Sequence, residues 1–356
     1  MNIRSLRHKN NDLHDFIDQS IPKFHIIAIT ESWLNNNEAR QFQTNNYNFY
    51  SQSRNTKKGG GVGLFVKRNM NVKLRNDLNL QNNIEALIIE ILGGPDSKNK
   101  LIMVVYRPPT CSIQYFCDSI EEILIQMSQE NKSIIVVGDF NIEMFADTTE
   151  THRNYFLQLM NSFGLYGAIT IPTRITSAKQ SLIDNIFISC DRQISGTISC
   201  DLSDHLPIFI DIWSDKQNES NPNVLEFPLK KYSFSTVRIN KLNMKLCFAD
   251  WNEVFACQNV NQSWEKFIDN YSIYFEECCQ INNKKKILKM QKQKPWMNGE
   301  IKKYLKKKNN CFKKFIKNPT KENEDRFKTS NKTFKKMKAK AKKQYLFQEL
   351  KKMSMT

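Results

Sequence analysis

Asp139 and Asn141 follow a run of β-branched residues and have the chemistry to form part of a catalytic site. Residues 134–137, Ile-Ile-Val-Val, are typical of a strand buried on both faces, and Gly138 is expected to end that strand in a turn. A carboxylate and an amide two residues apart fall on one side of an extended chain. Desolvating them is costly, which suggests a function, although an Asx turn is supported equally well by this stretch alone.

Other side chains with useful chemistry also stand beside predicted strands. They are Glu31, Tyr106, Asp184, Asp204 and His205. Each alone has a plain explanation: the start of a helix, a core tyrosine, a bulge in a strand, or a turn. Their shared position at strand ends favours a single site, because sites in layered folds collect at one edge of a sheet.

These residue types match the needs of phosphodiester hydrolysis, which requires an activated water and stabilisation of charge at phosphorus. A hard cation such as Mg²⁺ takes one or two carboxylates, which Glu31 and Asp204 can supply. Asp139 is expected to orient or deprotonate the water. His205, held by the Asp184 carboxylate, is expected to donate a hydrogen bond to a phosphate oxygen. Two further side chains are expected to contact the same phosphate: Tyr106 and Asn141.

The elements that must position these residues are mostly strands. Helical periodicity is present at 7–17, 113–127 and 152–163. Strands are predicted at 25–30, 47–53, 62–66, 84–92, 101–106, 134–137, 169–171, 182–189 and 206–212. Many strands with about three helices favour an α+β fold, with two packed sheets and helices on the outside.

Charge divides the chain differently from periodicity. Residues 281–356 hold 26 Lys and Arg against 5 Asp and Glu, a formal charge of +21, so that residues 1–280 carry −4. Sparse aromatic residues at helical spacing predict long basic helices in this tail. A neutral body with a basic tail favours a nucleic-acid partner over a solvated lysine-rich segment. We therefore expect three regions: a domain at 1–213, a polar linker at 214–240 and a basic helical region at 241–356.

Composition also bears on location. The nine cysteines include no C-x-x-C pair, which favours reduced thiols over a disulfide framework or a zinc ribbon. The amino terminus lacks the apolar run of a signal peptide, and no stretch of about 18 apolar residues occurs. We expect a nuclear or cytoplasmic protein that is not secreted and does not bind membranes.

Six short motifs together resemble the endonuclease/exonuclease/phosphatase superfamily. They are Asn2-Ile3, Thr-Glu-Ser-Trp at 30–33, Tyr-Arg-Pro-Pro at 106–109, Gly-Asp-Phe-Asn at 138–141, Ile-Asp-Asn-Ile-Phe at 183–187 and Ser-Asp-His-x-Pro at 203–207. Their order and spacing are similar to the endonuclease domain of LINE-type (non-LTR) retrotransposons, from residue 2 to about 213. The resemblance implies a four-layer α/β sandwich and nicking of DNA that depends on Mg²⁺, with Mn²⁺ as an alternative cation.

The resemblance also implies a role for each site residue. The metal group is Asn2, Glu31 and Asp204. The catalytic group around the scissile phosphate is Tyr106, Asp139, Asn141, Asp184 and His205, in which Asp184 orients His205. The nucleic-acid-binding group is Arg4, Thr173, Arg174 and Ser203.

Two features depart from the pattern of the family. The family normally has a strand running into the position of Asn2, and only Met1 precedes Asn2 here. Arg4 stands where the related repair nucleases have an acid near the metal, which favours cutting of intact DNA over repair of apurinic sites. Residues 294–300 and the basic helices after them resemble the segment between endonuclease and reverse transcriptase. No Asp-Asp polymerase signature follows, as expected of a truncated element.

Three functions are compatible with the sequence. The first is a nuclease that nicks target DNA and leaves a 3′-hydroxyl as primer for retrotransposition. The second is a phosphatase of the same superfamily that acts on inositol phosphates or lipids. The third is a catalytically dead remnant that binds DNA, or RNA as a second candidate partner, through its basic tail. Nicking that requires Mg²⁺ separates the first from the other two.

Overall fold

The structure is a computed structural model of the whole chain. It describes residues 1–20, 23–35, 38–42, 44, 46–54, 59–78, 84–93, 98–144, 151–189, 193–212, 231–232, 236–257, 259–281 and 294–353. These residues form two compact units. One comprises Met1–Pro222 with Gln293–Thr356, and the other comprises Asn223–Lys292.

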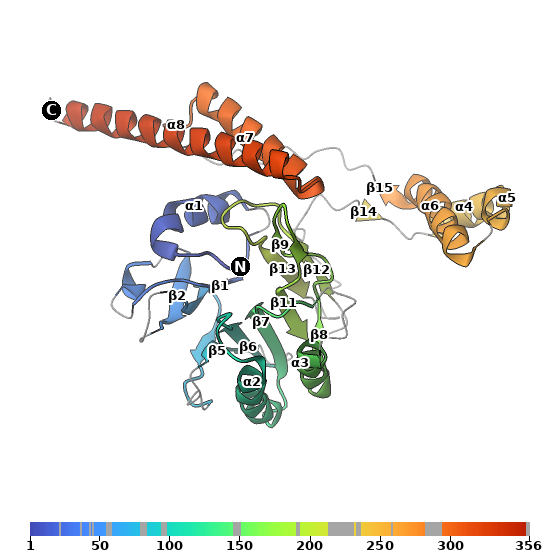
Figure 1. Cartoon of the computed structure of the whole chain (residues 1–356), viewed down its shortest axis with the longest axis horizontal. Helices are drawn as coiled ribbons and strands as arrows, with labels where there is room; N and C mark the ends of the chain where they lie inside the picture. Colours follow the sequence, from blue (N-terminus) through green and yellow to red (C-terminus); the bar gives the residue numbers. More distant parts are fainter. Residues whose placement is uncertain are drawn as a thin grey trace. The chain divides into compact units, whose positions relative to one another are not determined.

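A six-stranded sheet forms the centre of the first unit (Figure 1). Its strand order is β4-β5-β6-β7-β11-β8. The strands are β4 (Val72–Leu74), β5 (Glu85–Ile91), β6 (Lys100–Tyr106), β7 (Ser133–Asp139), β11 (Asp184–Ile188) and β8 (Tyr166–Gly167). Strands β6 and β7 run parallel, and the other neighbours are antiparallel.

A second layer of strands packs against this sheet. Three strands form an antiparallel sheet in the order β1-β3-β2, and two form the antiparallel pair β12-β13. A shorter pair, β9-β10, follows β8 in the chain. These strands are β1 (Ile26–Thr30), β2 (Tyr47–Gln52), β3 (Val62–Lys67), β9 (Arg174–Ile175), β10 (Gln180–Ser181), β12 (Gln193–Thr197) and β13 (Ile208–Ile212). A 3-10 turn, η1 (Ala39–Phe42), precedes β2.

Alternation of side chains along each strand separates the two faces of the large sheet. In β6, Leu101 and Met103 belong to the core on one face, whereas Ile102 and Val104 belong to the core between the sheets. Residues of β1, β3 and β13 complete the core between the sheets. A strand buried on both faces reads as a continuous apolar run, which is why these segments were recognisable from sequence.

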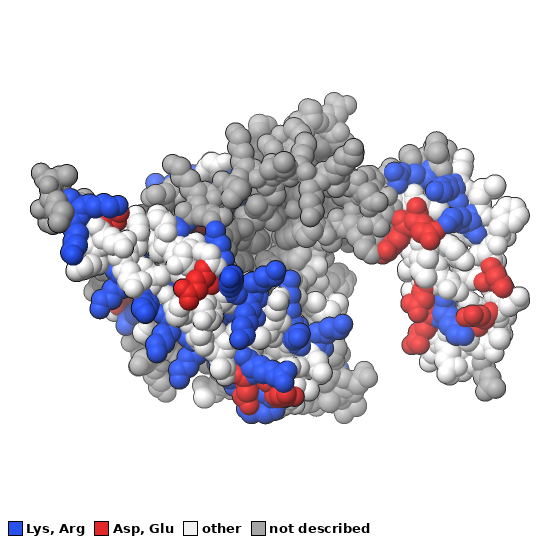
Figure 2. Space-filling model, turned by 90° about the horizontal axis from the view of Figure 1, so that it is seen from above, with Lys and Arg blue, Asp and Glu red and all other residues white. Residues whose placement is uncertain are grey.

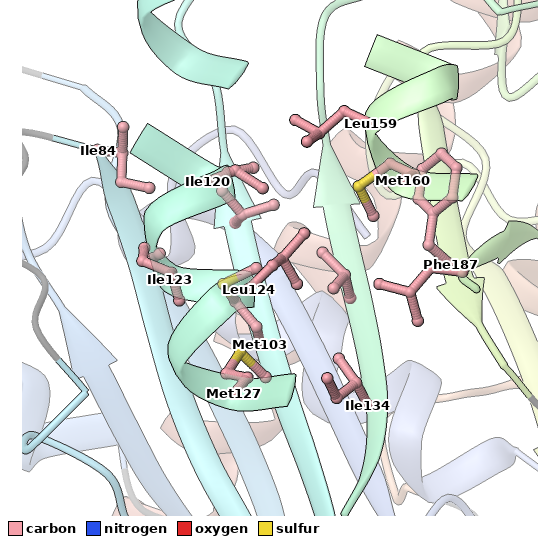
Figure 3. Packing of buried hydrophobic residues seen from close by; sticks show 14 of the residues in the cluster. Ile84, Met103, Ile120, Ile123, Leu124, Met127, Ile134, Leu159, Met160 and Phe187 are labelled. Carbon is pink, nitrogen blue, oxygen red and sulfur yellow. The ribbon is translucent and has the colours of Figure 1, made fainter. Parts of the chain in front are cut away.

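Helices α2 (Ile113–Ser128) and α3 (Thr151–Ser162) cover the outer face of the large sheet (Figure 3). Helix α2 buries Phe116, Ile120, Leu124 and Met127 on one stripe, as residues three or four apart must be. In Figure 3 this stripe lies over Met103 and Ile134 of the sheet, together with Met160 of α3.

Helix α1 (Leu6–Gln19) covers the outer face of the smaller sheet. Leu6, Leu13 and Ile17 pack against Ile27 and Ile29 of β1. The layers are therefore helix, sheet, sheet and helix. The predicted α+β fold and the four-layer sandwich are confirmed.

Two local predictions are wrong. Residues 169–171 form no strand, and the short strand in this part of the chain is β8 at Tyr166–Gly167. Gly138 makes no turn, because β7 continues through it to Asp139. A Cβ at Gly138 would lie 1.9 Å from the carbonyl oxygen of Val105 on β6, so glycine is required by the close approach of two strands.

The end of the chain in the first unit is a helical hairpin of α7 (Gly299–Lys317) and α8 (Lys321–Met353). The Asn298 side chain caps α7 by accepting from the Ile301 N–H at 2.9 Å. The hairpin packs on the sandwich through a small apolar cluster of Phe312, Phe315, Ile316 and Phe327 with Ile175 and Leu206. The long basic helices predicted for this segment are thus present.

The second unit is a small helical assembly. Its elements are β14 (Lys231–Tyr232), α4 (Thr236–Cys247), α5 (Asn252–Phe255), α6 (Val260–Cys279) and β15 (Gln280–Ile281). Most of the predicted linker, 214–240, lies outside the described residues, and its last five residues are helical. The division at 213 and 240 stays a prediction, and the two compact units cut across the predicted region at 241–356. Among the described helices, none is long and apolar enough to cross a bilayer.

Candidate active site

Four polar residues occupy one row across the large sheet. Glu85 pairs with Tyr106, Tyr106 with Asp139, and Asp139 with Asp184 in the register of β5, β6, β7 and β11. Along its own strand, each lies an even number of residues from side chains that belong to the core between the sheets. In β7, for example, Asp139 follows Ile135 and Val137 of that core. Alternation therefore aims all four side chains into the same layer, at its edge.

Asn2 joins the two sheets at this edge. Its backbone forms a parallel bridge with Thr30, in which the Ile3 N–H donates to the Thr30 carbonyl at 3.0 Å. Its amide Nδ2 donates to Glu31 Oε1 at 2.7 Å and to Asp139 Oδ2 at 2.8 Å. Because both carboxylates accept from one nitrogen, Glu31 and Asp139 are held next to each other.

Asp184 and His205 form a buried pair. His205 Nδ1 lies 2.8 Å from Asp184 Oδ2, and the two residues are 3% and 2% exposed, Asp184 first. Thr173 is fully buried and donates its hydroxyl to Asp184 Oδ2 at 2.6 Å. Burial disfavours the imidazolium, but the Asp184 carboxylate outweighs this and raises the pKa of His205 above its ordinary value. The predicted orientation of His205 by Asp184 is present in the structure.

A buried arginine holds the loop that follows β7. The Arg107 guanidinium donates to the carbonyls of Phe140 at 2.7 Å and Asn141 at 2.6 Å. In return the Asn141 amide donates to the Arg107 carbonyl at 2.8 Å. The Asn141 N–H donates to Asp139 Oδ1 at 3.1 Å, so the Asx turn that sequence offered as an alternative is also there. The turn and the site are therefore the same feature.

Negative charge is disfavoured at Asp139. Burial and the neighbouring Asp184 carboxylate raise the pKa of Asp139 to about 7. Burial also raises the pKa of Tyr106 above its ordinary value, and the carboxylates of Glu31 and Asp139 add to the effect. A positive charge is what would favour the ionised form of these groups.

The rim of the site is partly exposed and more basic. Asp204 accepts from the guanidinium groups of both Arg4 and Arg174, each at 3.1 Å. The Ser203 hydroxyl donates to the Asn2 carbonyl at 2.6 Å, which fixes the loop before His205. Arg4 and Arg174 are exposed enough to reach a partner, with side chains 41% and 37% accessible.

The backbone at this edge is strained. Arg4, Glu31 and Asn141 have φ values of 45°, 54° and 48°, a left-handed conformation that side chains with a Cβ rarely adopt. Such residues persist where the surrounding structure holds them, commonly at functional sites. Here Glu31 and Asn141 are held by the bonds to Asn2 and Arg107 described above.

The donor set fits a hard divalent cation. Carboxylate and amide oxygens from Glu31, Asp139 and Asn2 are the ligand types that Mg²⁺ takes. Among the described residues, Asp139, Asp184 and His205 also form a group whose ligand atoms lie within 4.8 Å of one another. A cation bound to His205 Nδ1 would have to displace its bond to Asp184. Glu31 and Asp139 are therefore better placed to supply oxygen ligands.

The model of the Endonuclease/Exonuclease/phosphatase family matches residues 1–205, and the chain belongs to this family. Enzymes of this family are hydrolytic and depend on divalent metals. No curated protein matches the sequence.

Solved structures with a similar fold include nucleases. The AP endonuclease LMAP from Leishmania major has a TM-score of 0.50 and 16% identity, over 58% of this chain and 84% of that one. The endonuclease domain of TRAS1, a telomere-specific non-LTR retrotransposon, has a TM-score of 0.48 and 16% identity, over 59% and 94%. The 3′ phosphatase NExo from Neisseria, bound to product DNA hairpin, has a TM-score of 0.45 and 15% identity, over 60% and 97%.

The structure brings the predicted site residues to one edge of the two sheets, and their separate roles stay predictions. Thr173 is assigned to nucleic acid by sequence, but it is fully buried and bound to Asp184. Asp204 is assigned to the metal, but both its oxygens are paired with arginines. Sequence reasoning missed Glu85, which is 8% exposed and bonded to Arg54. It also gave no role to Arg107.

Proposed function

We propose that this protein is a metal-dependent endonuclease that nicks duplex DNA by hydrolysing a phosphodiester bond, of the kind found in non-LTR retrotransposons. The observation that supports it best is the convergence of Asn2, Glu31, Asp139, Asp184 and His205 at one edge of the sandwich. The retrotransposon assignment rests on the order and spacing of the six motifs. Arg4 in place of an acid favours intact DNA as the substrate.

The proposed chemistry uses these residues in distinct roles. Asn2 and Glu31 would hold the cation, with Asp204 joining them if it left its arginine partners, and the cation would supply positive charge to the phosphate and the leaving oxygen. Asp139 accepts a proton from the attacking water, helped by its raised pKa. His205, with Nδ1 bound to Asp184, has its other ring nitrogen to donate to a phosphate oxygen.

Tyr106 and Asn141 position the phosphate in this proposal. Tyr106 stands beside Asp139 in the register of β6 and β7, and its raised pKa keeps the hydroxyl protonated and able to donate. The Asn141 amide is fixed by Arg107. Both donors would stabilise charge that develops on the phosphate oxygens.

Conversion of supercoiled plasmid to the open circle tests the proposal. The full chain is expected to nick with Mg²⁺ or Mn²⁺ and to be inactive in EDTA. The Asp139→Ala and His205→Ala variants, purified identically, exclude a contaminating nuclease. Full activity in both variants would contradict the assignment. Release of inorganic phosphate from inositol phosphates, without nicking, would instead identify a phosphatase.

A further inference from the structure

The basic hairpin α7–α8 is seated at the rim of the candidate site. Leu206, directly after His205, packs against Phe312 and Phe315 of α7. The hydroxyl of Ser177, in the β9–β10 turn near Arg174, donates to Glu324 of α8. These contacts place the hairpin beside two segments that carry site residues.

Ion pairs hold the hairpin on the outer layers as well. Lys338 of α8 donates to Asp12 and Asp15 of α1, each at 2.9 Å. Lys294, just before α7, also donates to Asp15. Although burial favours the neutral acid, the two ammonium groups hold the pKa of Asp15 below its ordinary value. The α1 side of the hairpin is thus fixed by complementary charge.

One lysine of the basic hairpin is buried, although its local sequence is like that of the exposed lysines around it. Lys308 is 7% exposed, lies 5.3 Å from the centre of the Phe334 ring and donates to Asp201 Oδ1 at 2.8 Å. A buried ammonium is tolerable only when it is paired, and Asp201 is the counter-ion of Lys308. The pair joins the loop before Ser203 to the centre of the hairpin.

Most of the other lysines of the hairpin are exposed. Residues 294–353 hold 21 Lys and Arg against 5 Asp and Glu, a formal charge of +16. Figure 2 shows Lys and Arg side chains gathered over the two helices on the side away from the sheets. Exposed lysines include Lys303, Lys307 and Lys314 on α7 and Lys332, Lys336 and Lys340 on α8. Burial lowers the pKa of Lys9 of α1; Asp204 of the site opposes this shift, and Lys335 of α8 adds to it.

We propose that the exposed lysines of the seated hairpin extend the DNA-binding surface beyond the rim of the candidate site, and that the Lys308–Asp201 pair keeps the hairpin in place. This rests on the proposed function in taking DNA as the substrate. A rigid hairpin binds phosphates without losing the conformational entropy of a free tail. Its lysines then contribute affinity that depends on seating as well as on their number.

Asp201→Asn separates seating from charge. The substitution raises the formal charge from +17 to +18, so charge alone predicts tighter binding. The proposal predicts the opposite, because the buried Lys308 loses its counter-ion and the hairpin leaves its seat. The double variant Asp201→Asn with Lys308→Met returns the charge to +17 and places an apolar side chain against Phe334. It is expected to recover seating and most of the affinity.

Binding of a short fluorescent duplex is measured by anisotropy in EDTA, from about 50 to 200 mM KCl. Asp201→Asn is expected to weaken binding roughly tenfold and to flatten the salt dependence by about one unit of slope for each phosphate that the hairpin no longer neutralises. The matched control is Asp118→Asn, the same charge change at an exposed position on α2, which should bind at least as tightly as wild type. The melting temperature of the sandwich domain is compared between wild type and Asp201→Asn. Equal values exclude global unfolding of the variant.

The proposal is overturned if Asp201→Asn binds as tightly as wild type or if the double variant fails to recover. Faster nicking by Asp201→Asn would also overturn it, because the hairpin would then obstruct the site. Stronger binding of single-stranded RNA than of duplex DNA would assign the surface to another partner. Because binding is read without metal, failure here is distinct from failure of the plasmid test.

Discussion

The six-stranded sheet has a partly buried group of charged residues at each end of its strands, and the two groups differ in how their charges are balanced. The catalytic end consists of Glu31, Asp139, Asp184 and His205 around Asn2. The opposite end, here named the ion-pair end, consists of Arg75, Asp77, Glu90, Glu130 and Lys132. The two groups lie at opposite ends of the parallel strands β6 and β7. These strands pair from Lys100 with Ser133 at one end to Tyr106 with Asp139 at the other.

The difference lies in how negative charge is compensated. At the ion-pair end each acid contacts a full cation: Arg75 donates to Glu90 at 3.1 Å and to Asp77 at 2.7 Å, and Lys132 donates to Glu130 at 2.6 Å. At the catalytic end the side-chain and backbone donors to Glu31, Asp139 and Asp184 are one histidine and otherwise neutral groups. A balanced cluster stabilises the fold, whereas an acid-rich one has unmet demand for positive charge. That demand is what a metal or a histidine proton can meet.

The largest expected effect is at the catalytic end. Asp139→Asn removes the proton acceptor while preserving shape, and it should reduce the nicking rate by at least about 10³-fold. The melting temperature should be unchanged or higher, because burying a neutral amide avoids burying charge. Plasmid nicking and thermal unfolding are measured on the same sample. A clear loss of stability would show that this end, too, is held together by its charges.

The second effect is at the ion-pair end. Arg75 is 5% exposed, and Arg75→Met leaves Glu90 and Glu130 short of a partner. The free energy of unfolding should fall by about 3 kcal/mol, because the buried acid Glu90 and the partly buried acid Glu130 would then share the single cation Lys132. Urea unfolding measures it. Arg7→Met, which breaks the exposed pair with Glu38, is the control and should change stability by less than about 1 kcal/mol. The nicking rate of folded Arg75→Met should match wild type, and a large loss would contradict the comparison.

Arg107 offers an intermediate case, because it is a buried cation at the catalytic end that contacts carbonyls instead of carboxylates. Arg107→Lys keeps the charge but has one nitrogen in place of a planar fork, so it cannot hold Phe140 and Asn141 together. Nicking is expected to fall by about tenfold through misplacement of Asn141. Arg68→Lys, at a surface position, is the control. Equal rates in both variants would remove Arg107 from any positioning role.

The smallest effect is a pH dependence of stability. Hydrogen bonds from Arg75 hold the pKa of Glu130 at about 2, against an ordinary value of 4.5. A lowered folded-state pKa gives stability that is complete above pH 4.5 and is lost as the pH falls towards 2. The gap in melting temperature between wild type and Glu130→Gln should therefore be constant above about pH 5 and narrow on acidification. A gap that widened in acid would show that folding raises the pKa of Glu130, which is the opposite of the expected shift.

Sequence reasoning found much of the catalytic end because its residues stand beside strands that read as apolar runs. Asp139 was predicted after such a strand, Asp184 within one and His205 before one. Glu85 was missed because β5 runs antiparallel to β6, so its first residue meets the last residue of its neighbour. Glu85 also lies outside the six motifs, so nothing in its local sequence connects it with the site unless the register is known.

Two buried contacts could not be predicted from the sequence for a different reason. Lys308 lies in a lysine-rich helix, and nothing in its local sequence distinguishes a buried lysine from the exposed ones around it. Its burial depends on Asp201, more than a hundred residues earlier in the chain. Thr173 is similar, since its position under Asp184 is set by tertiary packing. Long-range partners cannot be deduced from periodicity.

The left-handed backbone at Glu31 and Asn141 has a consequence for how this protein could be improved in the laboratory. Glycine at either position would relieve the conformational strain and is expected to raise the melting temperature. It would also delete a side chain on which the proposed reaction depends. Selection for thermostability alone would therefore favour inactive variants of this protein. A screen for more stable variants has to measure nicking activity as well as the melting temperature.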